Sequence, residues 1–95
     1  MLSELVFEWD GRKASQSRKH GVSFDEAAFL DENARLMRDP DHSDGEERFL
    51  FLGLSTRVRL LVVCHCYRKD DGVIRLISAR KADRSEREQY AEFLP

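Results

Sequence analysis

The sequence predicts an α+β fold in which helices pack on one antiparallel sheet, with the element order β-α-α-β-β-β-β-α. Segments rich in β-branched and aromatic residues alternate with turn residues, as strands and their connections do. Helix-capping residues follow the first of these segments, and the last three are joined by connections too short for a parallel crossover. At 95 residues, the chain is expected to form a single domain over residues 1–95.

The start of the chain predicts one strand and one helix. Residues 5–9 are mostly bulky or β-branched, and Asp10-Gly11 after them is typical of a turn that can also begin a helix. Residues 13–20 contain no Pro or Gly and end before Gly21, the residue type that best tolerates the left-handed conformation beyond a helix end. A short polar helix is therefore expected there.

A second helix is predicted to begin at Ser23, because Ser23-Phe-Asp-Glu26 matches a capping box. In that motif the Ser23 hydroxyl accepts a hydrogen bond from the Glu26 amide, and the Glu26 carboxylate accepts one from the Ser23 amide. The apolar pattern ends near residue 31. Residues 34–38 then predict an edge strand, and residues 39–45, with Pro, Gly and Asp, predict a loop.

The second half of the chain predicts three strands and a final helix. Short connections at residues 55–57 and 69–72 favour antiparallel hairpins. The middle strand is apolar on both faces and is expected to be central in the sheet. Asp83-Arg-Ser-Glu86 offers a cap for the helix. The expected ranges are 48–54, 58–68 and 73–80 for the strands and 83–93 for the helix.

Strand alternation predicts that both faces of residues 73–80 carry an arginine. A regular strand would place Ser78 and Arg80 on the same face as Ile74 and Leu76. It would place Arg75 on the opposite face.

Charge is distributed unevenly along the chain. The net charge is −2, but residues 1–47 carry a formal charge of −6 and residues 48–95 one of +4. A cationic second half can hold phosphates by Coulomb attraction and counterion release. The alternative is that the two halves neutralise each other through ordinary surface ion pairs.

Neither a membrane segment nor a metal or cofactor site is expected. The longest apolar run, residues 60–64, is far shorter than a bilayer span, and the start of the chain lacks a signal-peptide pattern, so the cytoplasm is the expected location. Cys64 and Cys66 are expected to be free thiols on one face of a strand, with His65 on the other. No converging set of ligands is found near them.

Several side chains suit proton transfer or phosphate binding. His20, next to Lys19 at a helix end, is a candidate because histidine is the side chain best suited to exchange protons near neutrality, although a histidine there can also simply interact with the helix dipole. His65 can exchange protons too, and Glu47, Tyr90 and His42 are weaker candidates. An arginine fork matches two phosphate oxygens, whereas the alternative is that these arginines only cover apolar surface. The cationic candidates are Arg48, Arg80, Lys81, Arg84 and Arg87.

A combination of short motifs in a fixed order is more specific than any single residue. The motifs are Phe7-Glu-Trp-Asp10, Lys19-His-Gly-Val-Ser-Phe24 with Glu26-Ala27, Asp39-Pro40, Glu47-Arg48, and Ile74-Arg-Leu-Ile-Ser-Ala-Arg80 followed by Glu86-Arg87 and Tyr90. With these motifs, of which Lys-His-Gly and Ile-Ser-Ala-Arg are the most distinctive, the chain resembles the BrnT family of toxins over about residues 5–93.

The resemblance implies a RelE-like fold and a ribonuclease activity that slows translation. It also implies neutralisation by a BrnA-type antitoxin, which binds DNA and represses the operon that the two proteins share. RNA cleavage by its own 2′-hydroxyl requires a base, an acid and cations, none of which has to be a metal. Arg48 and Arg80 are assigned to phosphate, His20 to proton transfer, and Lys19 to substrate binding or charge stabilisation. The family's recurring polar positions fall on Lys13, Lys19, His20, Arg48, Ser78, Arg80 and Tyr90.

One departure affects Lys13. Family members usually carry Asn three residues before the Lys of Lys-His-Gly, whereas this chain has Gln16 and is one residue shorter between Lys13 and Lys19. One residue turns a helix by about 100°, which changes the direction expected for Lys13. The alternative to a nuclease is a non-catalytic module or co-repressor that only binds its antitoxin. Direct DNA binding by this acidic chain alone is disfavoured.

Overall fold

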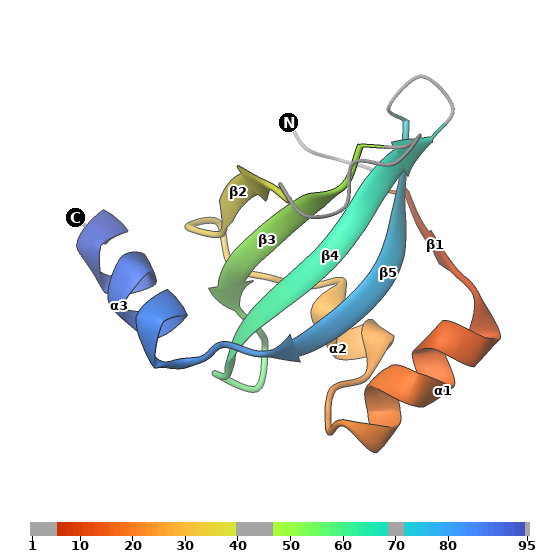
Figure 1. Cartoon of the computed structure of the whole chain (residues 1–95), viewed down its shortest axis with the longest axis horizontal. Helices are drawn as coiled ribbons and strands as arrows, with labels where there is room; N and C mark the ends of the chain where they lie inside the picture. The colour runs from red at the N-terminus through yellow and green to blue at the C-terminus, as the bar shows by residue number, and fades with distance from the viewer. Residues whose placement is uncertain (1–5, 40–46, 69–71, 95) are drawn as a thin grey trace.

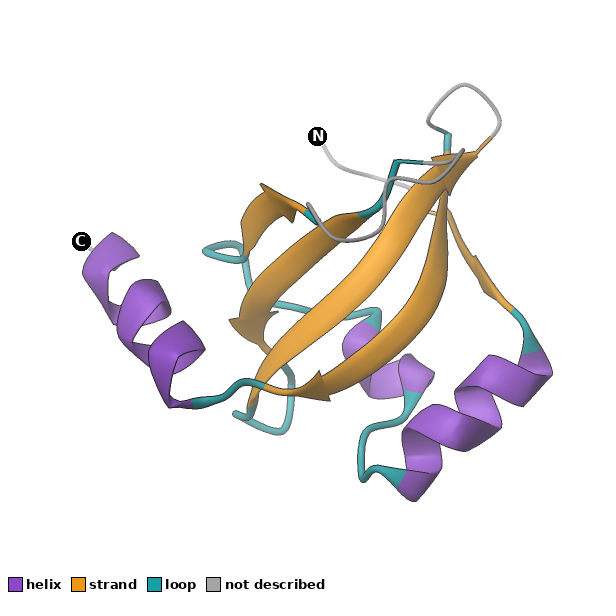
Figure 2. Ribbon diagram, in the orientation of Figure 1, coloured by secondary structure: helices purple, strands orange, loops and turns teal. Residues whose placement is uncertain are grey.

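A five-stranded sheet with helices on both faces forms the structure (Figures 1 and 2). The computed structural model describes residues 6–39, 47–68 and 72–94. None of the helices in these ranges is long and apolar enough to cross a membrane. The order predicted from the sequence is confirmed: β1 (Val6–Trp9), α1 (Gly11–Lys19), α2 (Phe24–Ala27), β2 (Arg35–Arg38), β3 (Phe49–Leu54), β4 (Leu60–Arg68), β5 (Val73–Lys81) and α3 (Arg84–Phe93).

Within the sheet the strands follow the order β1-β5-β4-β3-β2, so β4 is central and β2 lies at an edge, as predicted. The pairs β2–β3, β3–β4 and β4–β5 are antiparallel, but β1 pairs with β5 in parallel. The prediction of a wholly antiparallel sheet was wrong at this pair. Connection length predicts the direction of consecutive strands only, and β1 and β5 are the first and last strands of the chain. The predicted connections at 39–45 and 69–72 lie mostly outside the described residues.

A β-bulge in β5 moves the residues that follow it to the face opposite the one predicted. Cys64 pairs with Ser78 and His65 with Leu76, which leaves Ile77 as the extra residue of β5. Ser78 and Arg80 therefore lie on the face opposite Leu76, and the alternation expected from a regular strand was wrong beyond the bulge. One face of β5 carries Ile74, Leu76, Ala79 and Lys81, and the other carries Arg75, Ser78 and Arg80.

The larger hydrophobic core lies between the sheet and the helices α1 and α2. Its rings include Trp9 and Phe24, which meet edge to face at 5.8 Å. A smaller core lies on the other face, under α3. The buried residues of the larger core are Ala14, Val22, Phe24, Ala27, Leu61, Val63, Ile74, Leu76 and Ala79, and those of the smaller are Leu52, Val62, Ala82 and Tyr90.

Capping residues fix where the helices begin. Asp10 accepts a hydrogen bond from the Arg12 amide at 2.7 Å, so α1 starts two residues earlier than predicted. Asp83 and Glu86 form the full capping box predicted for α3. At α2 only half of the predicted box forms: Ser23 accepts from the Glu26 amide, but the Glu26 carboxylate contacts Arg59 instead.

His65 is fully buried on the α1 side of β4. Its ring stacks on Phe51 with centroids 4.0 Å apart, and its nitrogens lie 3.2 Å from the Val63 carbonyl oxygen and 3.3 Å from the Tyr67 hydroxyl. Burial lowers its pKa to about 4. The neighbouring Cys64 and Cys66 are buried and form no disulfide within the described part of the chain, and they lie on the opposite face, as predicted.

The depressed pKa of His65 predicts that the protein loses stability in mild acid. The unfolded chain binds a proton near pH 6.5, whereas the folded chain resists protonation until about pH 4, so stabilisation present above pH 6.5 is lost as the pH falls toward 4. Between pH 7 and pH 5 the free energy of unfolding should fall by about 2 kcal/mol from this group. Urea unfolding of His65→Phe should show a flatter pH dependence in this range. His20→Ala, at an exposed histidine, is the control and should keep the wild-type pH dependence. Equal curves of unfolding free energy against pH for wild type and His65→Phe would show that His65 is not the group responsible.

Candidate functional site

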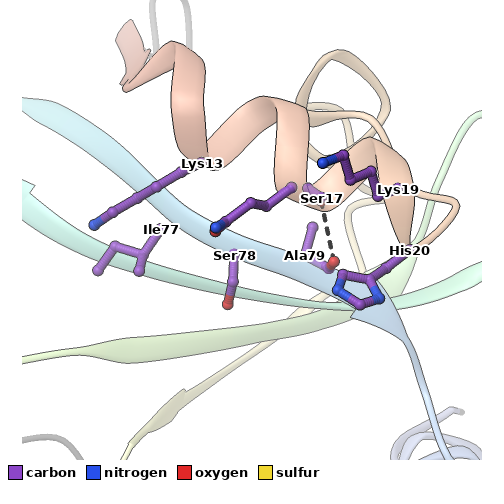
Figure 3. A pocket seen from close by; sticks show the side chains of 8 residues that line it. Lys13, Ser17, Lys19, His20, Ile77, Ser78 and Ala79 are labelled. Atoms are coloured by element: carbon purple, nitrogen blue, oxygen red, sulfur yellow. Dashed lines mark hydrogen bonds between the residues drawn. The ribbon is translucent and has the colours of Figure 1, made fainter.

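A hollow of about 510 Å³ opens between α1 and β5, and its wall combines basic and small side chains (Figure 3). The helix contributes most of the polar groups and the strand contributes the opposite wall. The lining residues are Lys13, Gln16, Ser17, Lys19, His20, Ile77, Ser78 and Ala79. Four residues predicted for the site, Lys13, Lys19, His20 and Ser78, are thus brought together.

Helical periodicity explains why these α1 residues share one side. Lys13, Gln16, Ser17 and His20 are spaced three or four residues apart, which stacks them on one face of a helix. The shorter spacing before Lys19 therefore does not remove Lys13 from the hollow. Figure 3 shows Lys13 at one end of the row and His20 at the other, near Ala79.

The hollow exists because β1 is short. β1 pairs only with Val73–Leu76, so the rest of β5 has no strand on that side among the described residues. Ser17 links α1 to this open edge: its hydroxyl oxygen lies 2.6 Å from the Val22 carbonyl oxygen and 3.1 Å from that of Ala79, the contact dashed in Figure 3. Ser17 is buried, so this hydroxyl satisfies backbone groups that water does not reach.

His20 lies at the C-terminal cap of α1. Its amide donates to the Ser17 carbonyl at 3.0 Å, and Gly21 after it takes a positive φ of 92° that lets the chain turn back. Arg18 and Lys19 precede it in the last helical turn, where cations are favoured by the helix dipole. The imidazole side chain is exposed and lines the hollow.

A second group of polar residues surrounds Ser78 on the α3 face of the sheet. Cys64 pairs with Ser78 and has its sulfur 4.0 Å from the Asp39 carboxylate. Burial, followed by the Asp39 charge, raises the pKa of the Cys64 thiol, while the nearby Arg48 lowers it. Arg48 is therefore close to the strand that carries Ser78. Ser78 belongs to this group and also lines the hollow, so the two sites are adjacent.

Arg80 lies on the same face, and both ends of its guanidinium fork are bound to Glu86. The two Nη–Oε distances are 2.7 Å each, and this hydrogen bonding lowers the pKa of Glu86. One Glu86 oxygen also accepts from the Asp83 amide at 2.9 Å. The Arg80 side chain is about half exposed, at 52%, so it can be reached from solvent although it is paired.

The other predicted site residues do not line the hollow. Lys81 is exposed on the α1 side, Arg84 lies 3.5 Å from Glu88, and Arg87 donates to the Ala82 carbonyl at 3.0 Å. Tyr90 is buried and donates to Asp31 at 2.6 Å, and its burial raises its pKa to about 12. Of the remaining proton-transfer candidates, His65 is buried beneath the sheet, Glu47 pairs with Arg38, and His42 lies outside the described residues.

Four lining residues were not predicted: Gln16, Ser17, Ile77 and Ala79. The helical spacing from Lys13 was a signal for Gln16 and Ser17. Nothing in the sequence indicated the bulge at Ile77. Within residues 6–39, 47–68 and 72–94, no three His, Cys, Asp or Glu side chains are grouped in a way that could hold a metal ion.

Comparison with known proteins agrees with this architecture. The sequence model of a family described as the ribonuclease toxin BrnT of type II toxin–antitoxin systems matches residues 9–86. The crystal structure of the Brucella abortus ribonuclease toxin BrnT is similar, with a TM-score of 0.64 at 21% sequence identity, covering 85% of this chain and 100% of that chain. At this identity the likeness concerns the fold alone. No curated protein matches the chain significantly.

The position of Tyr90 predicts an effect on stability. Tyr90→Phe removes the donor to Asp31 while keeping the ring, so the free energy of unfolding should fall by about 1.5–3 kcal/mol. Chemical denaturation measures this change, with the exposed Glu92→Gln on the same helix as the control. If Tyr90→Phe kept full stability but lost affinity for RNA, the role of Tyr90 would be to bind RNA and not to hold α3 in place.

Proposed function

Because the chain belongs to the BrnT family of ribonuclease toxins of type II toxin–antitoxin systems, we propose that it is an endoribonuclease whose metal-independent site is the hollow between α1 and β5. The observation that carries this proposal is the convergence of Lys13, Lys19 and His20 on an open strand edge next to Ser78. Two cations can stabilise charge and an imidazole can act as base and acid, which are the contributions that transesterification of RNA needs.

The reaction is attack by a ribose 2′-oxygen on the adjacent phosphorus. A bond forms between the 2′-oxygen and phosphorus, the bond to the 5′-oxygen breaks, and a 2′,3′-cyclic phosphate and a 5′-hydroxyl result. His20 accepts the proton of the 2′-hydroxyl and returns it to the leaving 5′-oxygen, since it is the one imidazole that lines the hollow among the described residues. Lys19 and Lys13 stabilise the negative charge on the phosphorane.

Arg48, Ser78 and Arg80 extend this site along the α3 face and hold the flanking phosphates. For Arg80 this requires an exchange, because its fork is already occupied by Glu86. A phosphate presents the same pair of oxygens as a carboxylate and can replace it in this bidentate geometry. The exposed Lys81, Arg84 and Arg87 contribute longer-range attraction for RNA.

Cleavage of RNA by such a site inhibits translation in the bacterial cytoplasm, and a BrnA-like antitoxin restrains it. Contact with DNA is made only through that antitoxin. The net charge of −2 supports this division, because an acidic chain whose sequence has no recognition-helix pattern is a poor DNA ligand by itself.

Purified protein should cleave RNA in the presence of a chelator and leave 2′,3′-cyclic phosphate ends. His20→Ala should lower the cleavage rate by about 10²–10⁴-fold, the usual contribution of a positioned acid or base. Arg18→Ala, exposed in the same helical turn and not lining the hollow, is the matched control and should cleave like wild type. Rates come from single-turnover gels.

Two outcomes would contradict the proposal. Cleavage that persists in the combined His20→Ala and Arg80→Ala variant would place the site elsewhere. Intact RNA with wild-type protein that still binds its antitoxin, together with harmless expression in cells, would identify a non-catalytic binding module.

Lys13 should contribute to the salt dependence of the affinity for RNA. In the His20→Ala background, which binds without cleaving, Lys13→Gln should reduce the slope of log affinity against log salt by about 0.7, the value for one phosphate contact on a single strand. Arg12→Gln, one residue earlier and outside the hollow, should leave that slope unchanged. Equal slopes for Lys13→Gln and its parent would exclude a phosphate contact for Lys13.

A further inference from the structure

A partly buried ion pair, formed by Arg59 and Glu26, contacts the turn that carries His20. The Glu26 side chain is 5% exposed and its carboxylate binds Arg59 through both Nε, at 3.0 Å, and Nη2. The Ser55 hydroxyl donates to the same carboxylate at 2.5 Å. These hydrogen bonds lower the pKa of Glu26 although burial opposes the change, so the carboxylate is charged at neutral pH.

The pair extends to the end of α1 through one further contact. Arg59 Nη2 also donates to the Gly21 carbonyl oxygen at 3.0 Å. Gly21 directly follows His20 and has the positive φ that turns the chain. The guanidinium therefore joins the His20–Gly21 turn to α2 and to the loop between β3 and β4.

The loop that supplies Arg59 is tightly constrained. Val58 has a φ of 60°, a left-handed conformation that a β-branched residue adopts at an energetic cost. Ser55 holds the loop: its carbonyl accepts from the Val58 amide at 2.9 Å, and its hydroxyl oxygen accepts from the Arg57 and Arg59 amides at 3.2 and 3.4 Å. The surrounding bonds thus keep Arg59 in one orientation.

We propose that Arg59 and Glu26 are positioning residues for His20. The turn from Ser17 to Val22 is held on one side by the Ser17 hydroxyl at the β5 edge and on the other by Arg59 at Gly21. With both contacts present, the backbone that carries the imidazole has a fixed place beside the hollow that Ser78 and Ala79 also line. Without Arg59 the turn keeps the Ser17 hydroxyl contact and the buried Val22, but the Gly21 carbonyl next to His20 loses its anchor, and His20 loses its fixed distance to the reacting phosphate. This inference rests on the proposed nuclease function.

Arg59→Lys tests the proposal, because lysine keeps the charge but cannot reach the carboxylate and the Gly21 carbonyl as a planar fork does. The value of kcat should fall at least tenfold while KM changes less than twofold, since Lys13 and Lys19 still bind RNA. In the His20→Ala background the same substitution should change the single-turnover rate less than twofold. Arg57→Lys, an exposed arginine of the same loop, is the control.

A merely structural role would give a different pattern. If Arg59→Lys lowers the rate equally with and without His20, it acts through general destabilisation and the proposal fails. Glu26→Gln, which removes the charge and keeps the shape, provides a second variant and should reproduce the His20-dependent loss. Circular dichroism verifies that each variant is folded.

The imidazole can also be observed without any RNA. The Hε1 resonance of His20, assigned by its loss in His20→Ala, should shift and broaden in Arg59→Lys but not in Arg57→Lys. An unchanged resonance would overturn the positioning role even if the wild type cleaves RNA. If the wild type does not cleave RNA, the proposed function fails, and this resonance alone decides whether Arg59 positions His20.

Discussion

The shortness of β1 is the constraint on which the rest of the structure depends. Its four residues pair with the first four of β5 and then the chain enters α1 through the Asp10 cap. A longer β1 would continue along β5 and cover the edge that α1 now occupies. Because it stops, the second half of β5 has no strand on that side among the described residues, and α1 lies beside this edge with the hollow between them. Topology therefore brings residues from the two halves of the sequence together.

Most of the fold could be predicted because its signals are local. The cap at Asp83 and Glu86 and the hydrophobic central strand are contained in short stretches of sequence, and each was found as predicted. The parallel pairing of β1 and the bulge at Ile77 depend on residues far apart in the chain, so periodicity could not reveal them. The bulge mattered most, because one extra residue moved Ser78 and Arg80 to the other face.

The site was predictable in part for the same reason. Lys19 and His20 are adjacent, and a helix links them to Lys13 by simple spacing, whereas Ser78 was carried by the family pattern. Arg59 had no comparable signal, since its partner Glu26 is 33 residues away and already fitted a local capping motif. The Glu26 carboxylate could bind either the Ser23 amide or the Arg59 guanidinium. Tertiary packing decides between these partners, and here it favours Arg59.

The Glu86 carboxylate serves two purposes at once, as the cap of α3 and as the partner of Arg80. Any ligand that takes Arg80 away leaves Glu86 with the Asp83 amide, and any event that unwinds the first turn of α3 leaves Arg80 with its contact to the Lys81 carbonyl at 3.3 Å. By thermodynamic reciprocity, each of these changes favours the other to the same extent. The order of the C-terminal helix and the availability of this arginine are therefore coupled properties of the molecule.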